Sequence, residues 1–219
     1  GNFWLRFTSP HPKDFSDELI QTLKNSRHFA PYINLPMQSG DDTTLKKMNR
    51  HYTARDYLSL VKKIRAAMPD IAISTDIIVG FPGETQCQFQ NTAQVFTAAN
   101  MDMAYISKYS PRPQTLSAKK YADSIPLKEK KKRFDTLNAI LKQSALAHNK
   151  QYLGKTVIIL VDKVNNGSIS GKTATYKTVQ VIVPPKSNTQ TKKLLGTFVD
   201  VTITKTRDFS IEGKTNSKL

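Results

Sequence analysis

A carboxylate interrupts an apolar stretch of the sequence, IAISTDIIVGFPGET, at Asp76. A carboxylate in a buried strand needs a hydrogen-bond partner or a ligand, so Asp76 either binds a backbone N–H nearby or contacts a polar ligand. Gly80, Gly83 and Glu84 follow in the turn, but the glycine spacing matches neither G-x-G-x-x-G nor G-x-x-x-x-G-K-[ST], and no lysine comes after it. The turn therefore gives poor support for binding of a nucleoside triphosphate.

Polar residues also follow three other strand-like segments in the first 125 residues. Because the carboxyl ends of parallel strands meet at one edge of a sheet, where ligands bind, these residues are expected to converge. Four polar strand ends in succession predict a polar ligand site at that rim. Besides the turn after Asp76, the ends contain Ser9, Gln38, Ser39, Lys108 and Arg112.

The segments that would position these residues alternate between strand and helix. Helices are predicted after the cap residues Ser16, Thr53 and Thr85, each followed by apolar residues at core spacing. This alternation is typical of βαβ units and a parallel sheet. Since four strands cannot close an eight-stranded barrel, we expect an open or partial (β/α) barrel. The predicted strands are 3–8, 32–37, 71–80 and 102–110.

Two further segments complete the predicted organisation. A long helix is expected over 124–153, and its first turns hold the run KEKKKR (128–133), which is either a ligand-facing surface or a solvated face because its charge opposes the helix dipole. From Lys155 onward, short alternating segments separated by Gly, Asn and Pro predict a small, closed or nearly closed antiparallel β-barrel. We therefore expect an α/β domain over 1–150 with the helix at its end, and a β-barrel domain over 151–219.

Composition restricts the partners and the kinds of site. The net charge is +16, from 33 Lys+Arg against 17 Asp+Glu, which favours a polyanion such as nucleic acid over a merely soluble basic surface. The single cysteine, Cys87, excludes a disulfide framework and any Cys-rich metal or iron–sulfur site supplied by this chain alone. The sequence has no apolar run of about 18 residues and no signal-peptide layout at its start, so we expect a cytoplasmic protein without a membrane span.

Four ordered stretches carry a family resemblance: RFTSPHPKDFSDELI, LPMQSGDDTTLKKMNRHYT, STDIIVGFPGET and YSPRPQT. Together they resemble the radical S-adenosylmethionine (SAM) methylthiotransferases, and within that family the MiaB-type tRNA enzymes. SGKTATYKTVQV and GTFVDVTITKT are similar to the TRAM domain of these enzymes, a small OB-like β-barrel that binds tRNA. The closely related threonylcarbamoyladenosine branch stays an alternative, as does a non-catalytic RNA-binding module.

The resemblance implies a reaction and its cofactors. In this family, SAM bound to a 4Fe-4S cluster is cleaved to a 5′-deoxyadenosyl radical that removes hydrogen from C2 of an adenine base. Sulfur and a methyl group are then added, which gives 2-methylthio-N6-isopentenyladenosine next to the anticodon of tRNA. Three cysteines in a CxxxCxxC loop hold that cluster, and three cysteines of an N-terminal domain hold a second 4Fe-4S cluster.

None of these six cysteines is present in the sequence. We therefore expect the chain to be the C-terminal half of a larger enzyme, beginning near the third strand of a partial radical SAM barrel, and to be inactive alone. The expected partners are tRNA, the N-terminal half of the enzyme and an electron donor that reduces the cluster.

The resemblance also suggests roles for individual residues, which are predictions for this chain. No catalytic residue and no metal ligand is predicted within it. The residues expected to contact SAM are Ser9, Gln38, Ser39, Thr75, Asp76, Gly80, Gly83 and Glu84. The residues expected to contact RNA are Arg112, Lys155, Lys172, Lys177 and Lys205.

Overall fold

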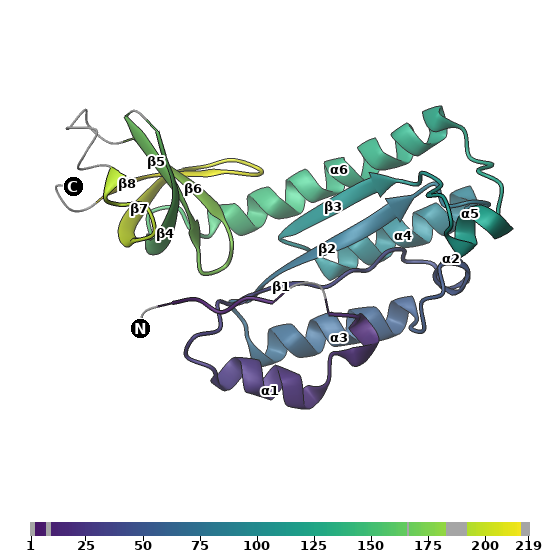
Figure 1. Ribbon diagram of the computed structural model, residues 1–219, viewed down its shortest axis with the longest axis horizontal. Helices are drawn as coiled ribbons and strands as arrows, with labels where there is room; N and C mark the ends of the chain where they lie inside the picture. The colour runs from purple at the N-terminus through teal and green to yellow at the C-terminus, as the bar shows by residue number, and fades with distance from the viewer. Residues whose placement is uncertain (1–2, 8–9, 166, 183–191, 216–219) are drawn as a thin grey trace. The chain divides into compact units, whose positions relative to one another are not determined.

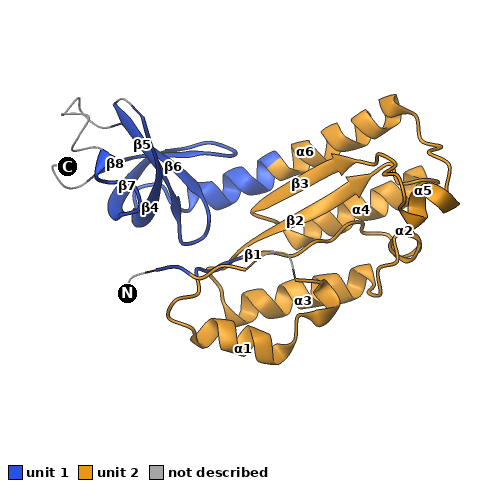
Figure 2. Cartoon of the chain, viewed as in Figure 1, with its two compact units in different colours: residues 1–4, 30–32, 142–219 blue, residues 5–29, 33–141 orange. Residues whose placement is uncertain are grey.

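The computed structural model describes residues 3–7, 10–165, 167–182 and 192–215. The chain forms two compact units (Figure 2). One contains residues 5–29 and 33–141 and holds the α/β portion; the other contains residues 1–4, 30–32 and 142–219 and holds a β-barrel. Helix α6 (Leu127–Lys150) has its first residues in the α/β unit and its last residues in the barrel unit.

The α/β unit is built on a sheet with the strand order β1-β2-β3 (Figure 1). Strands β2 and β3 are parallel, with Asp76 opposite Tyr105 and Ile78 opposite Ser107. Helix α3 lies between β1 and β2 in the chain, and α4 lies between β2 and β3, which is the βαβ arrangement that the alternation predicts. The elements are η1 (Pro12–Asp14), α1 (Asp17–Asn25), β1 (Tyr32–Asn34), α2 (Asp42–Lys47), α3 (Ala54–Ala67), β2 (Ala72–Val79), α4 (Gln86–Ala99), β3 (Met103–Lys108) and α5 (Leu116–Lys120).

The two faces of β2 have different surroundings. Ile73, Thr75, Ile77 and Val79 are fully buried, and the hydroxyl of Tyr57 in α3 donates to Thr75 Oγ1, so this face is covered by helices. The alternate residues Asp76 and Ile78 are only half-buried. Because side chains alternate along a strand, β2 presents one side to α3 and the side that carries Asp76 and Ile78 to the opposite face of the sheet.

Local sequence signals place three of the helices correctly. Ser16 caps α1 by accepting a hydrogen bond from the backbone N–H of Leu19. Thr53 and Thr85 begin α3 and α4 with reciprocal capping boxes. These caps depend on contacts within one helical turn, which is why the sequence alone is sufficient to locate them.

The predicted strand over 3–8 is wrong for the part that is described. Within residues 3–7 the sheet contact is a single bridge between Leu5 and Phe29. The predicted strand over 32–37 is shorter than expected, since β1 ends at Asn34 and is followed by one bridge between Gln38 and Ile77. An apolar segment becomes a strand only where a partner strand pairs with it, and the sequence does not give that partner.

Helix α6 buries one stripe of residues. Leu137, Leu141 and Ala145 lie on that stripe as predicted, and so do Lys130 and Arg133 from the basic run, which are 3% and 4% exposed. The other residues of that run are exposed or half-buried. Among the described residues, no helix is long and apolar enough to cross a membrane.

The barrel unit contains a closed barrel of the strands β4-β5-β6-β8-β7 among the residues described. Its core consists of branched aliphatic residues from all five strands. Four of the pairings are antiparallel and the fifth, β6 with β8, is parallel. The predicted small closed barrel is confirmed, and since a closed ring with an odd number of strands cannot be antiparallel throughout, its antiparallel pairing holds for every pair except this one. The strands are β4 (Thr156–Asn165), β5 (Ser168–Thr173), β6 (Thr178–Ile182), β7 (Phe198–Thr206) and β8 (Ile211–Thr215).

Candidate functional site

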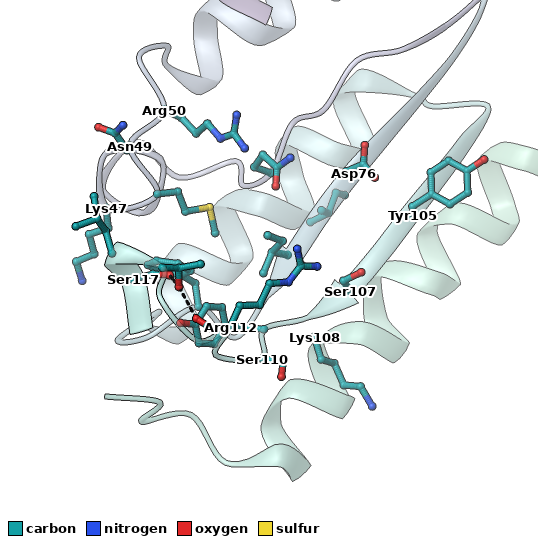
Figure 3. Close-up of a pocket in the computed structure, with 18 residues that line it drawn as sticks. Lys47, Asn49, Arg50, Asp76, Tyr105, Ser107, Lys108, Ser110, Arg112 and Ser117 are labelled. Carbon is teal, nitrogen blue, oxygen red and sulfur yellow. Dashed lines mark hydrogen bonds between the residues drawn. The ribbon is translucent and has the colours of Figure 1, made fainter. Parts of the chain in front are cut away.

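A cavity of about 590 Å³ lies on the face of the sheet that carries Asp76 and Ile78 (Figure 3). Asp76 and Ile78 from β2 and Tyr105 and Ser107 from β3 contribute to its lining. The remaining walls come from Gln38, from the end of α2 and the turn after it, from further residues of β2, β3 and the turn after β2, and from the segment after β3. Those further lining residues are Lys47, Met48, Asn49, Arg50, Ile77, Phe81, Lys108, Tyr109, Ser110, Arg112, Thr115, Leu116 and Ser117.

The charges in this lining are unbalanced. Among the described residues that line it, Asp76 is the one carboxylate, against the cations Lys47, Arg50, Lys108 and Arg112. In Figure 3 the side chains of Arg50 and Arg112 extend toward the open space of the pocket, whereas Lys108 turns away from it. The pocket therefore attracts anionic groups. The carboxylate of Asp76 on its floor can in addition accept hydrogen bonds from hydroxyl or amino groups.

Asp76 is held in place by a short polar ladder on this face. Its Oδ2 accepts a hydrogen bond from Asn34 Nδ2 at 2.7 Å, and Ser74 Oγ donates to Asn34 Oδ1 at 2.7 Å. The sequence left open whether Asp76 has a hydrogen-bond partner or contacts a ligand. In the structure it is hydrogen-bonded to Asn34 and also lines the cavity. Both roles that the sequence left open are compatible with its position.

Gln38 lines the pocket and has a left-handed backbone conformation. Its φ is +63°, in the left-handed region, and its N–H donates to Asp76 O while its carbonyl accepts from Ile78 N. These two bonds extend the sheet beyond β1 by one residue. They also place Gln38 in the same pocket lining as Asp76, and its contact with a cofactor stays a prediction.

Ser39 and Thr75 do not line the cavity. Thr75 Oγ1 accepts hydrogen bonds from Met37 N at 2.8 Å and from the hydroxyl of Tyr57 at 3.2 Å on the helix-covered face. Ser39 is fully buried against α4, where its hydroxyl is 3.1 Å from that of Thr92. Any contact of either residue with a cofactor would have to use the backbone, and such a contact stays a prediction.

The turn after β2 is filled by side chains of α6. Gly80 has φ +71°, and a Cβ at this position would collide with the side chain of Lys130. Gly83 has φ +74°, and its N–H donates to Ser124 Oγ. Gly80 is therefore required by its left-handed backbone and by the close approach of α6, and Gly83 by its left-handed backbone; the contact of either with SAM stays a prediction.

Glu84 forms a buried ion pair. Its Oε2 accepts from Arg133 Nη1 at 2.6 Å and from the N–H of Gly80 at 2.7 Å, and its side chain is 0% exposed. The other oxygen, Oε1, is buried without a hydrogen-bond partner among the described residues. Burial raises the pKa of this carboxyl above its ordinary value, and the bonds from Gly80 and Arg133 offset that effect only in part.

The predicted RNA-contacting residues fall into two groups. Arg112 lines the pocket of the α/β unit. In the barrel unit, Lys155 and Lys205 are exposed, and Lys172 and Lys177 are half-buried. Lys172 Nζ lies 5.0 Å from the ring centre of Tyr176, a cation–π contact. Ser9, predicted to contact SAM, lies outside the described residues.

The pocket lining fits the chemical groups of SAM. Asp76 offers an acceptor for ribose hydroxyls, and Arg50 or Arg112 offers a cation for the carboxylate of the methionyl group. Ile78 and Phe81 provide apolar surface of the kind on which a purine packs. The lining also includes Tyr109, whose buried hydroxyl has no hydrogen-bond partner among the residues described. No group of three His, Cys, Asp or Glu side chains that could hold a metal ion occurs in the described part of the chain.

Two protein-family models and one solved structure are similar to the chain. Residues 1–96 match the model of the Radical SAM superfamily, and residues 150–215 match that of the TRAM domain. A solved radical SAM enzyme, coproporphyrinogen III oxidase from Escherichia coli, shares the fold with a TM-score of 0.54 and 19% identity over 62% of this chain and 31% of that chain.

Curated relatives extend the similarity across both units. The tRNA-2-methylthio-N(6)-dimethylallyladenosine synthase of Geobacillus thermodenitrificans is 44% identical over 178 residues, which is 80% of this chain and 34% of that protein. The synthase of the same name from Caldicellulosiruptor saccharolyticus is 44% identical over 177 residues, 80% of this chain and 37% of that protein. The chain thus spans about a third of the length of the curated relatives it matches.

Proposed function

We propose that this chain, which belongs to the radical SAM superfamily and carries a TRAM domain, is part of a tRNA methylthiotransferase that acts on N6-dimethylallyladenosine (isopentenyladenosine) beside the anticodon. The observation that carries the proposal is the continuous similarity to synthases of that name, at 44% identity over 80% of the chain. A radical SAM fold alone is shared by enzymes of many reactions, whereas this similarity includes both units.

The α/β unit would bind SAM in the cavity on the face of its sheet that carries Asp76. When bound beside a reduced iron–sulfur cluster, SAM supplies the radical that activates the C2–H bond of the base. Asp76 orients the cofactor by accepting a hydrogen bond from its ribose, and Gln38 lies next to it on the same floor. The cations Arg50 and Arg112 neutralise a carboxylate or phosphate group at the pocket.

The iron–sulfur clusters need ligands that this sequence does not contain. Its single cysteine, Cys87, is exposed and follows the cap of α4 rather than lying in a CxxxCxxC loop. The proposal therefore places the ligands of both 4Fe-4S clusters in polypeptide outside these 219 residues, together with the contact for an electron donor. The 219-residue chain alone then performs no methylthiolation, and the whole enzyme works in the cytoplasm, where tRNA is modified.

The reaction is tested by reconstitution of the whole enzyme. Under anaerobic conditions it is given SAM, a reductant, a sulfur source and tRNA that carries N6-dimethylallyladenosine, and nucleosides are then analysed by mass spectrometry. We expect a methylthio product with this tRNA and none with tRNA that carries unmodified adenosine. Activity only on threonylcarbamoyladenosine would assign the enzyme to that branch instead.

The barrel unit would bind tRNA through its phosphates. Each lysine that contacts phosphate releases counterions, so the affinity for tRNA falls as salt rises. Replacing exposed Lys205 by Ala is expected to lower the slope of log affinity against log salt by about 0.7–0.9. The matched control is exposed Lys131→Ala in α6, which pairs with Asp135. A tRNA affinity that is independent of salt would refute this role of the barrel.

A further inference from the structure

The segment between Tyr109 and Asp123 forms the outer wall of the pocket. It contains α5 and contributes Arg112, Thr115 and Ser117 to the lining. Most of its residues are exposed. At its start, the N–H of Tyr109 donates to the carbonyl of Val79 at 2.9 Å, whereas the hydrogen bonds within the segment are short-range, such as those from Thr115 to the carbonyl of Arg112 and from Ala118 to Thr115. The position of Arg112 at the pocket therefore depends on what holds the two ends of this segment.

One buried lysine holds both ends. Lys130 Nζ donates to the carbonyl of Tyr109 at 2.9 Å and to the two carboxylate oxygens of Asp123 at 2.6 and 2.7 Å. Its ammonium group thus uses all three of its hydrogens. The lysine side chain is 4% exposed and that of Asp123 is 31% exposed, so the pair is screened from water on the lysine side.

The turn after β2 supports the same two ends with apolar contacts. Phe81 packs edge-on against Tyr109 with ring centres 5.1 Å apart, and against Tyr121 with ring centres 6.0 Å apart. The stem of Lys130 lies over Gly80, where a larger residue would displace it. The turn and α6 thus form one surface on which both ends of the wall segment are fixed.

We propose that Lys130 is a positioning residue that holds the 109–123 segment, and with it Arg112, at the pocket so that Arg112 meets an anionic group of the bound ligand. The anionic group is a tRNA phosphate or the carboxylate of the cofactor. The identity of the ligand rests on the proposed function. The claim that Lys130 holds the 109–123 segment in place, which is the structural part of the inference, does not. Lys131 and Lys132, in the same basic run, are exposed and have no such role.

Limited proteolysis tests the structural part in the whole enzyme. Trypsin cuts in this segment after Lys119 and Lys120, whereas Pro113 protects the bond after Arg112. In Lys130→Met we expect cleavage at these sites to be about tenfold faster than in the wild type, because the segment opens more often. Lys131→Met and Lys132→Met should be cleaved at the wild-type rate. Equal rates in Lys130→Met and both controls would overturn the proposal.

Binding measurements test the positioning role. Lys130→Met should weaken the affinity for tRNA, for SAM or for both by about tenfold, and the ligand affected identifies the anion that Arg112 meets. The same ligand should be weakened in Arg112→Met, and combining the two substitutions should add little, since Lys130 acts through Arg112. Lys130→Arg, which keeps the charge opposite Asp123, should recover at least part of the loss. Faster proteolysis with unchanged affinity for both ligands would show that Lys130 anchors the segment without serving binding, and would overturn the positioning role.

A second variant covers the case in which Lys130→Met does not fold. Asp123→Asn removes the partially exposed partner and leaves the lysine bonded to Tyr109, so it is milder and should accelerate proteolysis in the same direction. If proteolysis and binding change as expected while reconstitution gives no methylthio product, the proposed function fails and the role of Lys130 stands. If the product forms but Lys130→Met behaves like the controls, the proposed function stands and the role of Lys130 fails.

Discussion

The buried ion pair between Glu84 and Arg133 predicts a large and pH-dependent loss of stability when Arg133 is replaced by Met. Arg133 Nη1 lies 2.6 Å from Glu84 Oε2, and the two side chains are 5% and 0% exposed. Breaking a pair at this depth leaves a carboxylate without its cation, at a cost of about 3–5 kcal/mol in the free energy of unfolding. Lys131→Met, which removes an exposed pair with Asp135, should cost less than about 1 kcal/mol.

The pH dependence follows from the pKa of Glu84. Burial already raises that pKa, and loss of Arg133 raises it further, so the folded variant binds a proton at higher pH than the unfolded chain does. Stability is then greatest below the unfolded-state pKa of about 4.3 and falls as pH rises through the folded-state value. We expect the cost of Arg133→Met to be smaller at acid pH than at neutral pH.

The assay is urea unfolding followed by the helical circular dichroism signal, which reports mainly on the α/β unit. The double variant Glu84→Gln/Arg133→Met removes the orphaned charge while an amide oxygen still accepts from Gly80. It should recover about 2 kcal/mol or more relative to Arg133→Met at neutral pH. A cost below about 1 kcal/mol for Arg133→Met, or no recovery in the double variant, would refute the account of this pair.

Three other substitutions test the site and its supports. Asp76→Asn keeps an acceptor for Asn34 but loses the charge, so in the whole enzyme the affinity for SAM should fall about tenfold with unchanged stability; unchanged affinity would make Asp76 purely structural. Tyr57→Phe removes the hydroxyl that donates to Leu35 O and should cost about 1–3 kcal/mol in urea unfolding, and a loss near zero would contradict the buried bond. Gly213→Ala places a methyl group against Val201 in the barrel and should lower its melting temperature and weaken tRNA binding, whereas wild-type behaviour would show that the two strands separate easily.

Much of the α/β unit follows from local sequence signals. The caps at Ser16, Thr53 and Thr85 and the apolar run of β2 are determined by residues close in the chain, and the structure has each of them where the sequence predicts it. The segment 3–8 has the same strand-like composition as β1, yet within its described part only Leu5 is bridged. Strand formation depends on a distant partner, so composition alone cannot distinguish the two cases.

The site was harder to predict because neighbouring residues have different surroundings. Asp76 lines the pocket and Thr75 is bonded to Tyr57 on the helix side, so the two belong to opposite faces although they are adjacent in the motif. Because side chains alternate between the two faces of a strand, the sequence of β2 alone could have assigned Thr75 and Asp76 to opposite faces. Similarly, Lys130 and Arg133 lie seven and four residues before Leu137 on the helical stripe, a spacing that indicates burial within a run whose composition otherwise predicts a solvated face.

The most direct test of the central claim is the nucleoside composition of tRNA from a strain that lacks the gene for the whole enzyme. We expect 2-methylthio-N6-dimethylallyladenosine to disappear and N6-dimethylallyladenosine to accumulate in its place. The intact gene should restore the methylthio nucleoside, and the Asp76→Asn form should restore less of it. An unchanged amount of the methylthio nucleoside in the deletion strain would contradict the account.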